Sequence, residues 1–143
     1  MRLLNPSPGE ILDRLSILEL KITAATKRSV SSTHFEAEKA SLEEVLKTWE
    51  QGIAEDCMGD GDRLTETLVQ IAGHRNGLAA CNALLWQAED DVRALPAEAA
   101  FKLASLCKRI VSWNDGRAAH VRELNKLYGM EDEPEKIFAT VAK

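Results

Sequence analysis

The chain has 143 residues, of which 45% are hydrophobic and 29% are charged, and its formal net charge is −5 at pH 7. This length and composition predict one folded domain over residues 1–143, and they exclude a disordered chain or a disulfide scaffold. The acidic balance argues against binding to nucleic acid or to an anionic membrane surface, because both need positive charge. The sequence has no apolar run long enough to cross a membrane and no signal peptide, so we expect a cytoplasmic protein.

A first helix is predicted from residue 8 to just before the Ser/Thr cluster at residues 29–33. Ser7-Pro8-Gly9-Glu10 is a capping box with proline at the first helical position. Apolar residues then recur at helical spacing, namely Ile11, Leu15, Leu18, Ile22 and Ala25.

A second helix is predicted from Thr33, which forms a capping-box pattern with Glu36, to Ile53. Its apolar stripe consists of Phe35, Leu42, Val45, Leu46, Trp49 and Ile53. Residues 54–62 contain Gly59 and Gly61 and read as a loop, at the end of which Asp60 or Asp62 caps a third helix.

The third helix is expected to end at Leu95, because the following proline forbids simple continuation. Its stripe is Leu64, Leu68, Ile71, Leu78, Leu85 and Val92. Pro96 is expected to open a fourth helix, which Gly129 closes as a left-handed cap. The stripe of that helix is Leu103, Cys107, Ile110, Val121, Leu124 and Tyr128.

These elements predict an all-α fold, an antiparallel four-helix bundle with two longer C-terminal helices. Residues 130–143 are expected to be a loosely packed acidic tail. Leu20 and Leu84 fall on the far sides of the first and third helices, so we also expect surface for self-association and a homodimer.

Polar residues intrude on the apolar faces of three helices. On a 100° helical wheel, Asn114, Arg117 and Asn125 fall within the apolar stripe of the fourth helix. The third helix carries polar residues, Arg75 among them, on one flank of its stripe, and Asp90 lies next to that flank. On the wheel of the first helix, Asp13 is turned away from the apolar stripe. We call the converging set the polar seam and define it as Glu10, Arg14, Lys21, Asn82, Trp86, Glu89, Arg93, Asn114 and Arg117.

Two interpretations of the seam stay open. It is either a buried network that fixes helix register, or a binding site for a small anionic ligand such as a sugar phosphate or a nucleotide sugar. In the binding site, the arginines and Lys21 hold the anion, Asn82 and Asn114 orient it, Trp86 packs against it and Glu89 orients Arg93. In an enzyme, Glu89 or Glu10 would act as the acid or base.

Metal chemistry is disfavoured at the seam. Glu10, Glu89, Asp90 and Asn114 offer oxygen ligands, but the neighbouring arginines oppose a cation. No histidine follows a glutamate at the spacing of di-iron bundles. We therefore expect no metal and no cofactor. His34 and His120 are expected to face solvent, whereas His74 is expected at the edge of the core.

Three segments resemble an uncharacterised bacterial family of small helical proteins. They are residues 9–21 (GEILDRLSILELK), residues 82–93 (NALLWQAEDDVR) and residues 114–118 (NDGRA), and the Asn-x-x-Leu-Trp-x-x-Glu-Asp-x-x-Arg block is the most specific of them. Genes of that family often neighbour glycosyltransferases of surface-polysaccharide assembly. The resemblance thus implies a glycosyltransferase partner or a sugar-linked ligand. We expect a non-catalytic helical accessory or interaction module with a structural seam, and a binding protein or enzyme for an anionic ligand is the alternative.

Overall fold

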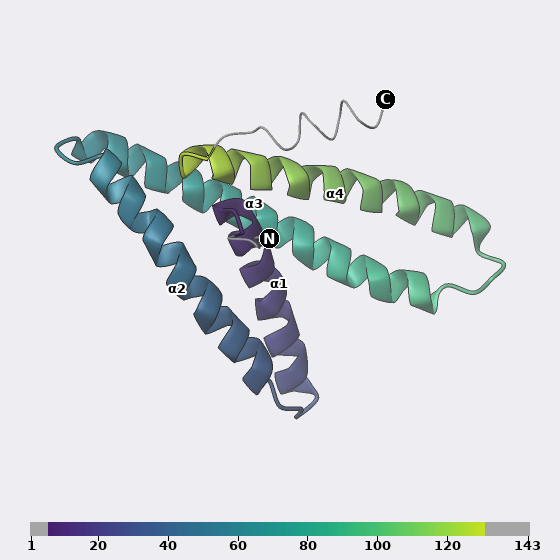
Figure 1. The fold of residues 1–143 in the computed structure, drawn as a ribbon. Helices are drawn as coiled ribbons and strands as arrows, with labels where there is room; N and C mark the ends of the chain where they lie inside the picture. Colours follow the sequence, from purple (N-terminus) through teal and green to yellow (C-terminus); the bar gives the residue numbers. More distant parts are fainter. Residues whose placement is uncertain (1–5, 131–143) are drawn as a thin grey trace.

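The computed structural model describes residues 6–130 and contains four helices (Figure 1). They are α1 (Pro8–Lys27), α2 (Thr33–Asp56), α3 (Gly61–Ala94) and α4 (Ala100–Leu127). The all-α four-helix bundle is confirmed, and so are the two longer C-terminal helices, with 34 and 28 residues against 20 and 24. The predicted acidic tail from residue 131 onward lies outside the described residues.

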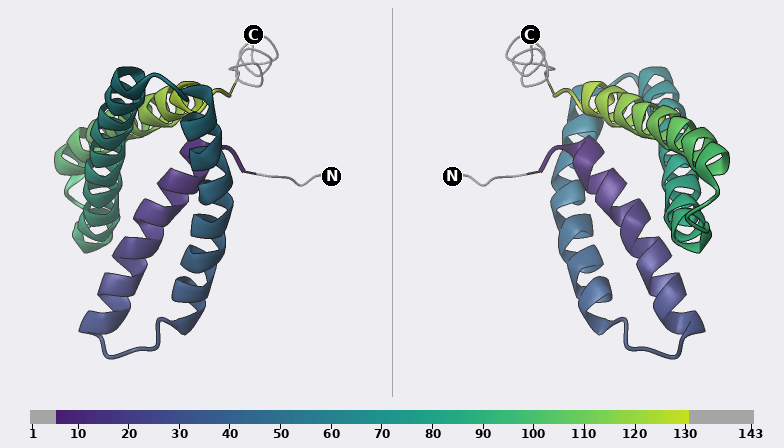
Figure 2. Two further views of the ribbon diagram at one scale, coloured as in Figure 1. Left: turned by 90° about the vertical axis from the view of Figure 1, so that its left-hand side faces the viewer. Right: turned by 90° about the vertical axis from the view of Figure 1, so that its right-hand side faces the viewer.

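The four helices form two antiparallel hairpins that cross one another. Helices α1 and α2 make the first hairpin, and the longer α3 and α4 make the second (Figures 1 and 2). Helix α1 packs against all three other helices, and α3 and α4 pack along each other. The hairpins overlap only where they cross, and each extends beyond that crossing on its own.

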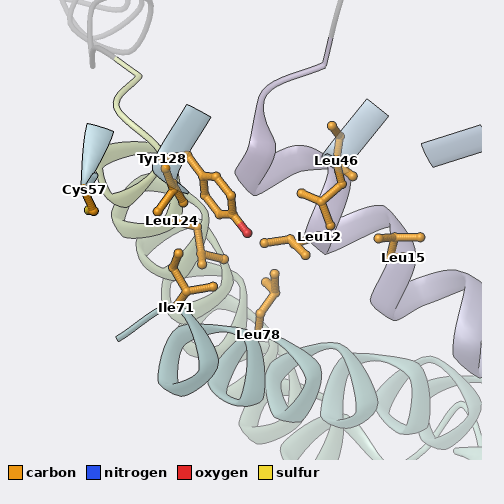
Figure 3. Close-up of a cluster of buried hydrophobic side chains, with 10 residues drawn as sticks. Leu12, Leu15, Leu46, Cys57, Ile71, Leu78, Leu124 and Tyr128 are labelled. Carbon is orange, nitrogen blue, oxygen red and sulfur yellow. The ribbon is translucent and has the colours of Figure 1, made fainter. Parts of the chain in front are cut away.

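The core lies at the crossing and draws on all four helices (Figure 3). Leu12 and Leu15 come from α1, and they meet apolar side chains of the other helices, among them Leu46, Ile71, Leu78, Leu124 and Tyr128. Several side chains that the stripes placed in the core are exposed, namely Val45, Leu68, Leu103 and Cys107. Leu103 and Cys107 lie on the part of α4 beyond the crossing, where no other hairpin covers the stripe. Val45 and Leu68 lie within the length of the core but on a side of their helices that is exposed to water.

Local chemistry marks three of the helix ends. The Oγ of Ser7 accepts a hydrogen bond from the N–H of Glu10 at 3.1 Å, and the Glu10 carboxylate accepts one from the N–H of Ser7 at 3.4 Å. Asp60 caps α3 by accepting a hydrogen bond from the N–H of Arg63 at 3.0 Å. Gly129 follows α4 with φ of 88°, which favours glycine. These predicted caps are confirmed.

One predicted cap and one predicted helix start were wrong. Helix α2 begins at Thr33 as predicted, but Thr33 is its first helical residue and not its cap, and the side chain of Ser32 before it makes no capping hydrogen bond to the backbone. Pro96 opens a turn, closed by the Ala99 N–H on the Pro96 carbonyl at 3.0 Å, and α4 begins only at Ala100. Leu95 is extended, as expected for a residue before proline. Helix α2 also runs on to Asp56, so the loop after it is shorter than predicted.

Gly9 brings the start of α1 directly onto α4. Its N–H donates to the Oδ1 of Asn125 at 2.8 Å. A Cβ at this position would lie 2.4 Å from the carbonyl oxygen of Val121, so only glycine fits without a shift of backbone. Asn125, predicted to point at the core, therefore has its partner in the first turn of α1. Within the described part of the chain, none of the helices has the length and hydropathy needed to cross a membrane.

Candidate functional site

A compact group of polar side chains joins α1, α3 and α4. Arg117 donates from Nε to Oδ1 of Asp13 at 2.9 Å and from Nη2 to Oδ2 at 2.6 Å. The Nδ2 of Asn82 donates to Oδ1 of Asp13 at 2.9 Å and to the Oγ of Ser16 at 3.2 Å. We call Asp13, Ser16, Asn82 and Arg117 the Asp13 cluster.

The Asp13 cluster is shielded from water on most sides. Asn82 is 4% exposed, and the side chain of Asp13 is 14% exposed. Hydrogen bonding to Asp13 raises the pKa of Arg117 above its ordinary value, against the opposing effect of burial. A bidentate Arg–carboxylate pair of this kind fixes the relative orientation of the two side chains as well as the distance between them. The cluster therefore links three helices through one carboxylate.

A groove opens next to the Asp13 cluster, between the same three helices. Its volume is about 330 Å³. Ile17 and Leu20 of α1, Leu85 of α3 and Ile110 of α4 form its apolar walls. Its remaining lining is polar or amphipathic and consists of Lys21, Asn82, Trp86, Glu89, Asn114 and Arg117.

These six polar or amphipathic lining residues all belong to the predicted seam, so the structure brings two thirds of that set together. Charges of both signs are present at the groove, because Lys21, Glu89 and Arg117 all line it and Arg117 already pairs with Asp13. The Nζ of Lys21 lies 5.5 Å from the centroid of the Phe35 ring of α2. Asp13 uses Nε and Nη2 of Arg117, which leaves the Nη1 amino group as the part not engaged by Asp13. Trp86 is half-buried, and Glu89 and Asn114 are exposed.

The three other predicted seam residues lie elsewhere. Glu10 is occupied in the cap of α1. Arg93 pairs with Asp90, one turn away on the same helix, at 2.5 Å, so Glu89 does not orient it. Arg14 faces α2, where its Nε donates to Glu38 at 2.5 Å.

Arg14 and Glu38 change each other's proton affinity. Hydrogen bonding to Glu38 raises the pKa of Arg14, and the same bond lowers the pKa of Glu38. Both side chains are about two-fifths exposed, at 42% and 39%. Water screens such a pair, so it contributes little to the stability of the fold.

Asp13 is the residue that sequence reasoning missed. It was expected to turn away from the seam, because it lies opposite the main apolar stripe of α1 on the helical wheel. Helix α1 lies between α2 and the α3–α4 hairpin, so its second face is covered as well (Figure 1). Asp13, Ile17, Leu20 and Ala24 follow one another at helical spacing on that face, and this second stripe was the available signal. Leu20, expected on the outer surface, accordingly lines the groove.

Two further features lie outside the seam. His120, expected to face solvent, is half-buried and contacts His74 of α3. A larger hollow of about 560 Å³ lies among the ends of α2, α3 and α4, and its lining, which includes Trp49, Arg63 and Tyr128, contains none of the predicted seam residues.

Over residues 6–130, no group of three or more His, Cys, Asp or Glu side chains is arranged to hold a metal ion.

Comparison with known proteins gives no relative: no family model, no curated protein and no solved structure matches this chain.

Proposed function

We propose that this protein is a non-catalytic helical interaction module that acts as a homodimer in the cytoplasm. In this proposal the Asp13 cluster is structural, and the molecule functions through a surface. The observation that carries the proposal is the uncovered apolar face of the α3–α4 hairpin beyond the end of α1.

That face continues the groove along α4. Leu103, Cys107, Ile110 and Asn114 follow one another at spacings of four, three and four, which places them on one side of the helix. Ile110 and Asn114 line the groove next to α1, whereas Leu103 is 41% exposed and Cys107 is exposed. Between Leu78 and Leu124, a stretch that lies wholly in the described part of the chain, Asn82 and Ala88 of α3 are the only buried residues, and α4 has none.

A second copy of the chain is the occupant that fits this face best. Two helices that pack only on each other leave part of each apolar stripe in water, and a second hairpin would complete a four-helix bundle. The groove is lined by Lys21, Arg117 and Glu89, and Arg117 is paired with Asp13 beside the groove. Two identical faces with such balanced charges meet without net repulsion, as a two-fold interface requires.

Sedimentation equilibrium of the full chain tests this proposal. We expect a mass twice the 15.8 kDa of one chain. Leu103→Glu, which puts a charge on the face, should raise the dimer dissociation constant at least about tenfold, given about 1.5–3 kcal/mol for a buried leucine. Phe101→Glu is the matched control, because Phe101 is 94% exposed and two residues away, on the opposite side of α4.

A monomeric parent, or equal loss of association in the two variants, would contradict the proposed dimer face. A circular dichroism spectrum of each variant establishes that the helices are retained, so that loss of association is not loss of folding.

A small anionic ligand in the groove is the second candidate function. The groove volume falls in the range of small-molecule sites, and Lys21, the Nη1 group of Arg117, Asn114 and Trp86 offer a cation, donors and an aromatic face. A sugar phosphate or a nucleotide sugar has the chemistry to use all four. The resemblance noted above adds a glycosyltransferase as the protein partner to test by co-purification.

Isothermal titration with glucose 1-phosphate and with a uridine diphosphate sugar distinguishes the two candidates. Saturable binding that Lys21→Gln weakens at least about tenfold would support the ligand site, since a charged hydrogen bond contributes about 1.5–3 kcal/mol. Absence of binding at millimolar ligand would reject it. Lys27→Gln, at the exposed end of the same helix, is the control.

A further inference from the structure

His74 of α3 and His120 of α4 face each other where the two helices pack together. Their Nδ1 atoms are 3.0 Å apart, and their ring centroids are 5.3 Å apart with the rings tilted by 60°. Both rings are half-buried, so one side of the pair reaches water. Neither residue lines the groove or takes part in the Asp13 cluster.

Gly77 determines how the ring of His120 lies. A Cβ at Gly77 would be 2.4 Å from Nε2 and 2.5 Å from Cε1 of His120, so this edge of the imidazole rests on bare α3 backbone. The opposite nitrogen, Nδ1, is thereby left facing His74. The arrangement depends on a glycine in the interior of a helix, where glycine is otherwise unfavourable.

Two ring nitrogens this close need a proton or a cation between them. One N–H can fill the gap as a single hydrogen bond, which requires one ring to donate and the other to accept. A metal ion that binds two imidazole nitrogens at about 2.0–2.1 Å with a tetrahedral angle holds them about 3.3 Å apart. A shift of a few tenths of an ångström would thus exchange the proton for a metal ion.

We propose that His74 and His120 form a two-histidine site for a borderline divalent transition-metal ion, of which Zn²⁺ is the probe. Imidazole ligands select such ions over Mg²⁺ and Ca²⁺, which prefer oxygen. Because no third side chain within residues 6–130 completes a metal-binding cluster, water fills the remaining positions. The ion would exchange with ions in solution. When bound, it would hold α3 and α4 together, and this site does not depend on the proposed dimer face.

Calorimetric titration of the metal-free full chain with ZnCl2 tests this site, with MgCl2 as the comparison ion. We expect one Zn²⁺ per chain and no Mg²⁺, a higher melting temperature with Zn²⁺, and at least a tenfold loss of Zn²⁺ affinity in His74→Asn and in His120→Asn. His34→Asn is the matched control, because His34 is exposed and its ring contacts Phe35 at the start of α2, away from His74 and His120.

Equal Zn²⁺ affinity in the parent and in the His74 and His120 variants would overturn the proposal, and so would an absence of binding by the parent. If a variant fails to fold, ¹⁵N spectra of the parent decide: Zn²⁺ must shift the Nδ1 resonances of both His74 and His120. A shift confined to His34 or to neither ring would refute the site.

Discussion

Asp13 and Arg117 lie 104 positions apart in the sequence, and the carboxylate of one accepts two parallel hydrogen bonds from the guanidinium of the other, at 2.9 and 2.6 Å. This pair fastens α1 to α4, and Asn82 adds α3 by donating to the same carboxylate. The first hairpin therefore crosses the second at a defined register, which apolar packing at the crossing alone would specify less sharply.

Gly9→Ala should destabilise the fold by about 1–3 kcal/mol, because the added methyl group would meet the Val121 carbonyl and Asn125. Gly73→Ala is the control, since nothing lies within 4 Å of its Cβ position. That variant should be more stable by about 0.5–1 kcal/mol, because alanine favours a helix interior. Urea unfolding measures both. The close approach of α1 to α4 would be contradicted if the two variants shifted in the same direction.

Ser7→Ala should cost about 1 kcal/mol of unfolding free energy, since it removes the hydroxyl that caps α1. Ser32→Ala should change stability by less than about 0.5 kcal/mol, because Ser32 precedes α2 without a capping hydrogen bond to the backbone. The two midpoints of urea unfolding, measured side by side, check this. Equal losses would mean that α2 is capped as firmly as α1.

His120 should make stability depend on pH below neutrality. Burial, and then His74, lowers the pKa of His120 in the folded state, so between that pKa and the ordinary value of about 6.5 the unfolded chain binds a proton that the folded chain does not. The free energy of unfolding should therefore fall as pH decreases through about 6.5. His120→Asn should flatten that part of the profile, measured by urea unfolding from about pH 5 to 8. His34→Asn should leave it unchanged, and an equally steep profile without His120 would rule out this cause.

Local chemistry made much of the fold predictable from the sequence. Ser7 with Glu10, Asp60 and Gly129 each mark a helix end through one side chain or one backbone conformation, and each was predicted and observed. Pro96 was placed wrongly because proline suits both a helix start and a turn, and the neighbouring residues supply no side-chain cap to favour the helix.

The site was predictable only in part, because helix periodicity does not say how many neighbours cover a helix. Lys21, Trp86 and Asn114, which the wheel positions predicted to converge, line the groove. Asp13 was missed because α1 is covered on two sides. Leu103 was assigned to the core because its position fits the stripe, although the crossing ends before it.

The measurement that tests the structural role of the Asp13 cluster most directly is urea unfolding of Arg117→Ala beside Glu89→Gln. Arg117→Ala leaves Asp13, whose side chain is 14% exposed, without its guanidinium partner, and should cost about 2–3 kcal/mol. Glu89→Gln changes an exposed residue on the rim of the groove and should stay within about 0.5 kcal/mol of the parent. The account would be contradicted by an Arg117→Ala variant as stable as the parent, or by a Glu89→Gln variant as unstable as Arg117→Ala. Either result would mean that the Asp13 cluster is not structural or that Glu89 does not lie at an open groove.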